Sequence, residues 1–334
     1  MTYSHLVATL GRLAELVPDP VLPVDEACAH EVMREGAAFA AAVDEAADAD
    51  AAAWGVARLR AYWMNGRIDE GRSRAERLLA EDGGVSAAAR VRVLEVAATL
   101  AFEQGDAATA RARLNEAAGL SRKGADADAE AMCLGGLARC ELMAGNLDAA
   151  REAARACEAI RARSGDEAAR VFPLHVLAYA DYIEGNDDSA RAGFHRTLEM
   201  NRRLGVRWRQ AQELTNLCSV ETRAGNLQEA RELGREALDI AVELDHALIL
   251  PYCVINIAGV ASAQGRHELA ARVLGAGDAL LAAAGMELNP GTAIEYRRHR
   301  LNTEAALGDE SFRVQYESGR SLTRAEAVAA AREV

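Results

Sequence analysis

The sequence predicts an all-α protein, a right-handed superhelical solenoid of helix pairs with 40 residues in each repeat. Nearly the same nine residues occur twice, as AGNLDAARE at 144–152 and AGNLQEARE at 224–232, with a weaker copy, EGNDDSARA, at 184–192. Half of the chain is hydrophobic, only 4% is aromatic, and alanine is abundant. This composition favours helix because alanine loses no side-chain entropy on folding.

Glycines mark the repeat. Looser copies of the phrase extend the series in both directions, and the successive gaps between glycines are 39, 40, 40, 40 and 40 residues, at positions 66, 105, 145, 185, 225 and 265. We expect each glycine to end one helix in the left-handed conformation and the next residue to cap the following helix. The cap residues in the inner units are Asp106, Asn146, Asn186 and Asn226.

Large and small residues recur at fixed distances from these glycines. A large apolar residue stands eleven positions before the glycine and a small residue seven before it, on one helix face. An alanine five positions after the glycine lets the second helix approach closely, and the remaining apolar surface needs a neighbouring pair to cover it. The three sets are Leu94, Leu134, Leu174, Leu214 and Val254; Ala98, Ala138, Ala178, Cys218 and Ala258; and Ala110, Ala150, Ala190, Ala230 and Ala270.

These positions resemble the tetratricopeptide repeat over residues 51–285. The period of 40 exceeds the 34 residues usual in that family, so we expect either longer helices or longer turns between units. A second stretch, AARVLGAGDALLAAAGMELNPGTAIEYRRHRLNTEAALGDESFRVQYESGRSLTRAEAVAAA at 270–331, resembles the end of the helical-repeat region in large bacterial ATP-dependent transcription regulators of the LuxR and SARP types.

Three regions follow from this pattern. Residues 1–50 are expected to form N-terminal capping helices, at about 2–17 and 24–48, separated by the proline-rich VPDPVLPVDEA. Residues 51–285 form the repeats. Residues 286–334 form a C-terminal helix pair and a capping helix, with one helix starting at Asn289-Pro290 and the last capped by Ser321 or Thr323.

The resemblance implies a non-catalytic receiver or interaction protein of bacterial signal transduction or transcription regulation. Such a protein binds a peptide, a protein segment or a small inducer in its concave groove. The chain has no GxxxxGK[ST] phosphate loop, and Lys123 is its only lysine, which excludes ATP binding of that kind. It is therefore either one region of a larger regulator or a stand-alone receiver. The alternative is a protein that binds, sequesters or processes a hydrophobic natural product.

In the tetratricopeptide family the first helix of each pair lines the groove. The corresponding positions lie thirteen, ten, six and three residues before each glycine, and in the Gly185 unit they are mostly aromatic. An aromatic wall with a few polar groups suits a small molecule or an extended peptide, although aromatics at helical spacing are also typical of an inter-repeat core. The predicted groove residues are Phe172, His175, Tyr179, Tyr182, Arg139, Leu142, Gln212, Thr215, Ser219 and Tyr252.

Charge and motifs exclude several other functions. With 38 basic and 51 acidic side chains, the formal charge of −13 disfavours binding to nucleic acid or to anionic membranes. The first residues lack the pattern of a signal peptide, so we expect a cytoplasmic protein. HELAA at 267–271 has Ala271 where a zinc protease needs its second histidine, and EYRRHR at 295–300 reads as a charged helix face. We expect no catalytic residues, no metal and no cofactor, reduced cysteines, and a protein, peptide or small-molecule partner; association of two copies is left open.

Overall fold

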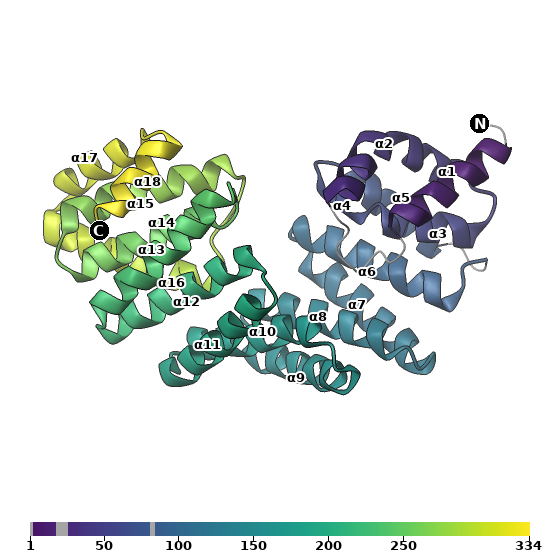
Figure 1. Ribbon diagram of the computed structural model, residues 1–334, viewed down its shortest axis with the longest axis horizontal. Coiled ribbons are helices and arrows are strands. Elements are labelled where there is room, and N and C mark those ends of the chain that lie inside the picture. Colours follow the sequence, from purple (N-terminus) through teal and green to yellow (C-terminus); the bar gives the residue numbers. More distant parts are fainter. Residues whose placement is uncertain (1–2, 18–25, 81–83) are drawn as a thin grey trace. The chain divides into compact units, whose positions relative to one another are not determined.

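The computed structural model describes residues 3–17, 26–80 and 84–334 (Figure 1), and within them every regular element is a helix. The helices of residues 1–164 are α1 (Tyr3–Leu16), α2 (Glu26–Glu45), α3 (Ala49–Arg58), α4 (Arg60–Met64), α5 (Ile68–Ala80), α6 (Ala87–Glu103), α7 (Ala107–Lys123), α8 (Ala127–Met143) and α9 (Leu147–Ser164). The remaining helices are α10 (Glu167–Glu184), α11 (Asp187–Arg203), α12 (Arg207–Ala224), α13 (Leu227–Glu243), α14 (Leu250–Ala263), α15 (His267–Ala283), α16 (Pro290–Leu307), α17 (Asp309–Arg320) and α18 (Arg324–Arg332).

The chain forms two compact units, residues 1–164 and 165–334, which we call unit 1 and unit 2. In both units, helices that follow one another in the sequence pack side by side, as in the pairs α6–α7, α8–α9, α10–α11 and α12–α13. This arrangement confirms the prediction of an all-α helical repeat. In unit 1, α1 and α2 pack against α3, and the proline-rich break predicted between them lies mostly outside the described residues.

Two series of left-handed turns set the period. The six predicted glycines have φ between 76° and 84°, which confirms their role as helix ends. A second series lies about halfway between them, at Ala125, Gly165, Gly205, Asp245 and Gly285, with φ between 50° and 73°. Most helices between these turns have 17 or 18 residues. Longer helices, not longer loops, therefore account for the 40-residue repeat.

The predicted helix caps are only partly correct. The Asp106 side chain accepts a hydrogen bond from the Thr109 amide at 3.1 Å, as expected. Asn186 and Asn226 make no side-chain cap, so that prediction was wrong for both. Their amide groups turn toward glutamates instead, and Asn226 Nδ2 donates to Glu221 Oε2 at 2.6 Å. At the last helix, Thr323 forms a capping box with Glu326, which decides between the two caps predicted there.

The small packing residues lie where the repeat pattern places them, and of the large ones Leu94, Leu214 and Val254 are buried while Leu134 and Leu174 are half-buried. All five alanines that follow the turn glycines are 0% exposed, and the small residues of the first helices are 2% exposed or less. Ala178 on α10 meets Gly193 on α11, where an added Cβ would lie 3.3 Å from the Ala178 backbone. Small residues at these contacts allow the paired helices to approach each other closely.

The C-terminal helices close unit 2. α17 packs on α15, α18 packs on α14 and α15, and α16 packs on α14 and α15 while also contacting α10. Gly275 and Gly319 face the backbone of the opposite helix at the α15–α17 crossing, so these two helices touch through their main chains. None of the described helices is long and apolar enough to cross a membrane.

Candidate functional site

The first helices of unit 2 present one continuous face to α16, and we call it the first-helix face. Most of its residues lie six or three positions before a turn glycine, which are two of the four positions at which the sequence predicts groove residues. α10 and α14 contact α16 directly, and α12 reaches it through an ion pair between Arg223 and Glu295. The face consists of Tyr179, Tyr182, Ser219, Arg223, Gly259 and Ser262.

Three of the predicted aromatic residues surround one buried ring. The ring centroids of His175, Tyr179 and Tyr182 lie 6.1, 6.4 and 6.2 Å from that of Phe194 on α11, and Phe194 is 0% exposed. Phe172 is half-buried. The rings thus contribute to the core between α10 and α11, while the tyrosine hydroxyl groups reach other helices. A ligand at this cluster stays a prediction.

The tyrosine hydroxyl groups connect α10 to α12 and α16. Tyr182 Oη lies 2.5 Å from Ser219 Oγ, and the Tyr179 hydroxyl donates to Asn289 Oδ1. The same Asn289 oxygen caps α16 by accepting from the Thr292 amide at 2.9 Å. Burial raises the pKa of both tyrosines well above its usual value, so both hydroxyl groups stay protonated at neutral pH.

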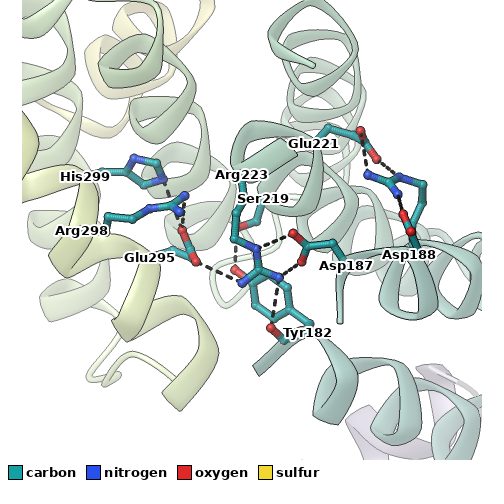
Figure 2. Close-up of polar contacts among 10 residues, drawn as sticks. Tyr182, Asp187, Asp188, Ser219, Glu221, Arg223, Glu295, Arg298 and His299 are labelled. Carbon is teal, nitrogen blue, oxygen red and sulfur yellow. Dashed lines mark hydrogen bonds and ion pairs between the residues drawn. The ribbon is translucent and has the colours of Figure 1, made fainter. Parts of the chain in front are cut away.

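Arg223 is the centre of an ion network on this face (Figure 2). Its guanidinium pairs with Asp187 from α11, lies 3.3 Å from Glu295 Oε1 on α16, and donates to the Tyr182 carbonyl at 3.1 Å. Arg298 holds the other oxygen of Glu295 at 2.5 Å. The Glu295 side chain is only 5% exposed, and burying a carboxylate is costly unless cations and hydrogen bonds compensate for it. The two arginines supply the compensating positive charge, and Arg223 also donates a hydrogen bond to Oε1.

A second buried carboxylate lies next to the aromatic cluster. The Glu213 side chain is 1% exposed, and Glu213 Oε1 lies 2.9 Å from Nδ1 of His175. His175 in turn stacks on Tyr179 with 5.8 Å between the ring centroids. The histidine therefore has a defined structural partner on α12.

The other predicted groove residues of unit 2 make local contacts. Thr215 donates to the Ala211 carbonyl at 2.7 Å, and Tyr252 donates to the Glu287 carbonyl at 3.2 Å, in the segment before α16. Gln212 is half-buried. Thr215 is buried, whereas Tyr252 lies at the edge of the surface that α16 and its preceding segment cover.

The sequence reasoning missed a cluster at the turn between α12 and α13. Arg191 on α11 pairs with Glu221 and lies 2.7 Å from Asp188, while Asn226 donates to Glu221. Although burial acts to raise the pKa of Glu221, hydrogen bonds from Arg191 and Asn226 hold it below its usual value. The period gave no signal for this cluster, because the pairing depends on side-chain directions across two helix pairs.

Two predicted groove residues belong to unit 1. The Arg139 guanidinium carbon lies 4.4 Å from the centroid of the Phe102 ring, and Arg139 Nη1 is 3.7 Å from Glu103 Oε1. Leu142 is 6% exposed. Within unit 1, Arg139 is thus the more accessible of the two, and its contacts are with α6.

Thiol and metal chemistry find little support. Burial raises the pKa of Cys133, Cys218 and Cys253 to about 12 and that of Cys157 to about 11, and a protonated, buried thiol is a poor nucleophile. Across residues 3–17, 26–80 and 84–334, no group of three or more His, Cys, Asp or Glu side chains could hold a metal ion.

Comparison with known proteins supports the fold. No protein-family model matches the chain, and no curated protein matches it. A solved Rap protein in complex with competence and sporulation factor is 15% identical over 95% of each chain, with a TM-score of 0.64. The fold is a tetratricopeptide-like helical repeat.

Two further solved structures are similar to this chain. The apo form of RapI is 11% identical over 98% of this chain and 97% of its own, with a TM-score of 0.58. The apo form of the quorum sensor NprR from B. thuringiensis is 13% identical over 95% of this chain and 88% of its own, with a TM-score of 0.57. At these identities the shared property is the helical-repeat fold.

Proposed function

We propose that the protein is a non-catalytic receptor of bacterial signal transduction or transcription regulation, which binds a peptide or protein segment on the first helices of its repeats. One observation carries this proposal. The first-helix face of unit 2 already holds a helix, α16, through side chains of three separate helix pairs. A face of this kind is suited to an amphipathic helix or a peptide, because regularly spaced side chains can contact successive positions of the bound segment.

The solved neighbours support the same general function. One is a Rap protein complexed with competence and sporulation factor, and another is a quorum sensor. By analogy, the partner of this chain is a signalling factor or a segment of a regulator. The resemblance of residues 270–331 to the LuxR and SARP types extends the proposal to transcription regulation, with the motor and DNA-reading functions on another domain or protein. We place this receptor in the cytoplasm.

The natural-product alternative is less well supported. A hydrophobic molecule would need the aromatic wall of α10, but Tyr179 and Tyr182 are 5% and 2% exposed beneath the start of α16. Their polar ends are already satisfied by Asn289 and Ser219. A segment that replaces the start of α16 can reproduce the hydrogen bond that Tyr179 makes to Asn289, whereas an apolar molecule would leave this buried hydroxyl group unpaired, which is costly.

Native mass spectrometry of the protein purified from its own host tests the proposal. A released peptide or a co-purifying polypeptide at defined stoichiometry is the expected result, and the same spectrum reports whether two copies associate. Release of a small apolar molecule would favour sequestration instead. A protein that stays empty in every growth phase would contradict the receptor proposal.

A further inference from the structure

Helix α16 contacts the first-helix face of unit 2 with a single stripe of side chains. Gly291, Glu295, His299 and Thr303 are spaced four residues apart, which places them on one side of the helix. Gly291 packs against Tyr179 and Tyr182 of α10. Glu295 pairs with Arg223 of α12, and Thr303 donates to Ser262 of α14 at 2.9 Å. Between them, the His299 ring covers Gly259, where an added Cβ would lie 2.7 Å from the imidazole.

This buried stripe is polar, whereas apolar side chains of the same helix face outward. Glu295, His299 and Thr303 are 3%, 7% and 0% exposed, but Ile294 and Leu301 are 48% and 58% exposed. α16 is thus held on the first-helix face by hydrogen bonds and ion pairs. Such contacts contribute little stability on balance, because the same groups bond to water when released. Another segment with matching polar groups can therefore replace α16 at modest cost.

The two halves of α16 are anchored differently. From the middle of the helix onward, the outer side is fixed to α15 and α17, since Tyr296 donates to Asp278 at 2.5 Å and Arg300 stacks on Phe312 and Tyr316. The first turns, from Asn289 to Glu295, lie on α10 and α12. They form the part of α16 that can leave the face while the rest stays in place.

We propose, on the basis of the receptor function above, that the natural ligand is an acidic helical segment that takes the place of the first turns of α16. It carries a small residue where Gly291 lies and a carboxylate four positions later, where Glu295 lies. The first requirement follows from the close contact at Gly291, because a Cβ there would lie 2.6 Å from the Tyr179 hydroxyl and 3.0 Å from the Tyr182 ring.

The second requirement follows from the charges on the face. Arg223, whose side chain is 17% exposed, is shared between Asp187 and Glu295. When Glu295 leaves, one ion pair of this buried guanidinium is lost, and only an incoming carboxylate restores it. Arg298 lies on the part of α16 that stays in place, so it too loses its carboxylate partner when Glu295 leaves. A neutral or basic segment would therefore bind less tightly than an acidic one.

A fluorescein-labelled peptide with the protein's own residues 286–295, which contain only the first turns of α16, serves as the probe, and fluorescence anisotropy measures its binding to the full chain. In the wild type, the tethered α16 competes with the probe at a high effective concentration. The substitution Gly291→Val prevents the first turns from docking on Tyr179 and Tyr182, so we expect the Kd of the probe to fall at least tenfold. Ala305→Val adds the same side chain at an exposed position of α16 and should leave the Kd at the wild-type value.

A second probe tests the charge requirement. With Glu295→Gln in the peptide, we expect binding to the Gly291→Val protein to weaken about tenfold, the effect of losing a charge-assisted hydrogen bond. Equal binding of both probes, or equal binding by the wild type and Gly291→Val, would overturn the proposal. If circular dichroism shows that Gly291→Val is unfolded, the isosteric protein variant Glu295→Gln replaces it, with tighter binding of the first probe as the expected result.

The outcomes separate this inference from the receptor function. A host partner that binds the protein but does not compete with the probe would refute the ligand chemistry and leave the receptor function standing. A probe that binds Gly291→Val as expected, in a protein that never carries a host partner, would refute the receptor function and leave the chemistry of the face intact.

Discussion

Replacing Gly319 by alanine should destabilise unit 2, although alanine is ordinarily the better helix former. At the α15–α17 crossing, a Cβ on Gly319 would overlap the carbonyl oxygen of Arg272 and would lie 3.1 Å from the Ala276 amide nitrogen. These are backbone atoms within a helix, so neither can rotate away. The two helices would have to separate.

The size of the effect follows from two opposing contributions. Overpacking a close contact costs up to about 3 kcal/mol. If α17 separated completely instead, the burial of Phe312 would be lost; this side chain is 3% exposed, and its burial contributes about 3 kcal/mol. Alanine recovers about 1 kcal/mol of helix propensity. We therefore expect a net loss of about 2 kcal/mol, or a decrease in Tm of about 4–8 °C for a unit of this size.

Gly119→Ala is the matched control. Gly119 lies within α7, and an added Cβ there would have no atom within 4 Å. It should therefore stabilise the protein by about 0.5–1 kcal/mol through helix propensity alone. Thermal and urea unfolding followed by circular dichroism would measure both variants. The reasoning would be refuted if Gly319→Ala were as stable as Gly119→Ala, because the backbones would then not be in contact at the crossing.

Three further predictions concern packing and pH. Ala190→Leu should overfill the α10–α11 contact and lower the free energy of unfolding by about 1–3 kcal/mol, whereas Ala192→Leu on the exposed side of α11 should change it by less than about 0.5 kcal/mol; equal effects in urea unfolding would contradict the packing. The folded-state pKa of Glu221 is lowered from 4.5. The stability that ionised Glu221 contributes is therefore fully present above pH 4.5 and is lost as the pH falls through the folded-state pKa. Glu221→Gln should accordingly show a shallower loss of stability below pH 4.5 than the wild type, and parallel acid-unfolding curves would argue against this role. Burial together with the nearby Arg298 lowers the pKa of His299 from 6.5 to about 4, so between these pH values the unfolded chain binds a proton that the folded chain does not. The free energy of unfolding should therefore fall as the pH decreases from 6.5 to 4. If His299→Gln showed the same dependence of this free energy on pH as the wild type, His299 would not be the cause.

The sequence predicted the repeat well because its signals are local. Turn glycines, a small residue one helix turn after a large one, and alanines in the second helix are each properties of a single helix pair, and all of them are found where the 40-residue period places them. The second series of turns was missed since two of its members, Ala125 and Asp245, are not glycine. A residue with a Cβ is seldom expected in the left-handed region.

The candidate site was less predictable because it depends on contacts between distant segments. Tyr179 and Asn289 are 110 residues apart in sequence, and no periodic pattern connects them. The segment from Glu295 to Arg300 reads as a charged, solvent-facing helix face, yet Glu295 and His299 are buried. The four-residue spacing of Gly291, Glu295, His299 and Thr303 is a signal for a buried stripe, but a stripe of polar residues is ordinarily interpreted as an exposed one.

Hydrogen exchange, followed by mass spectrometry on the full chain with and without the partner isolated from its host, tests the central claim most directly. If that partner replaces the first turns of α16, amide exchange should become faster in residues 290–295, while residues 179–182 and 219–223 remain protected. Unchanged exchange in α16, with new protection confined to helices away from the first-helix face of unit 2, would contradict the account.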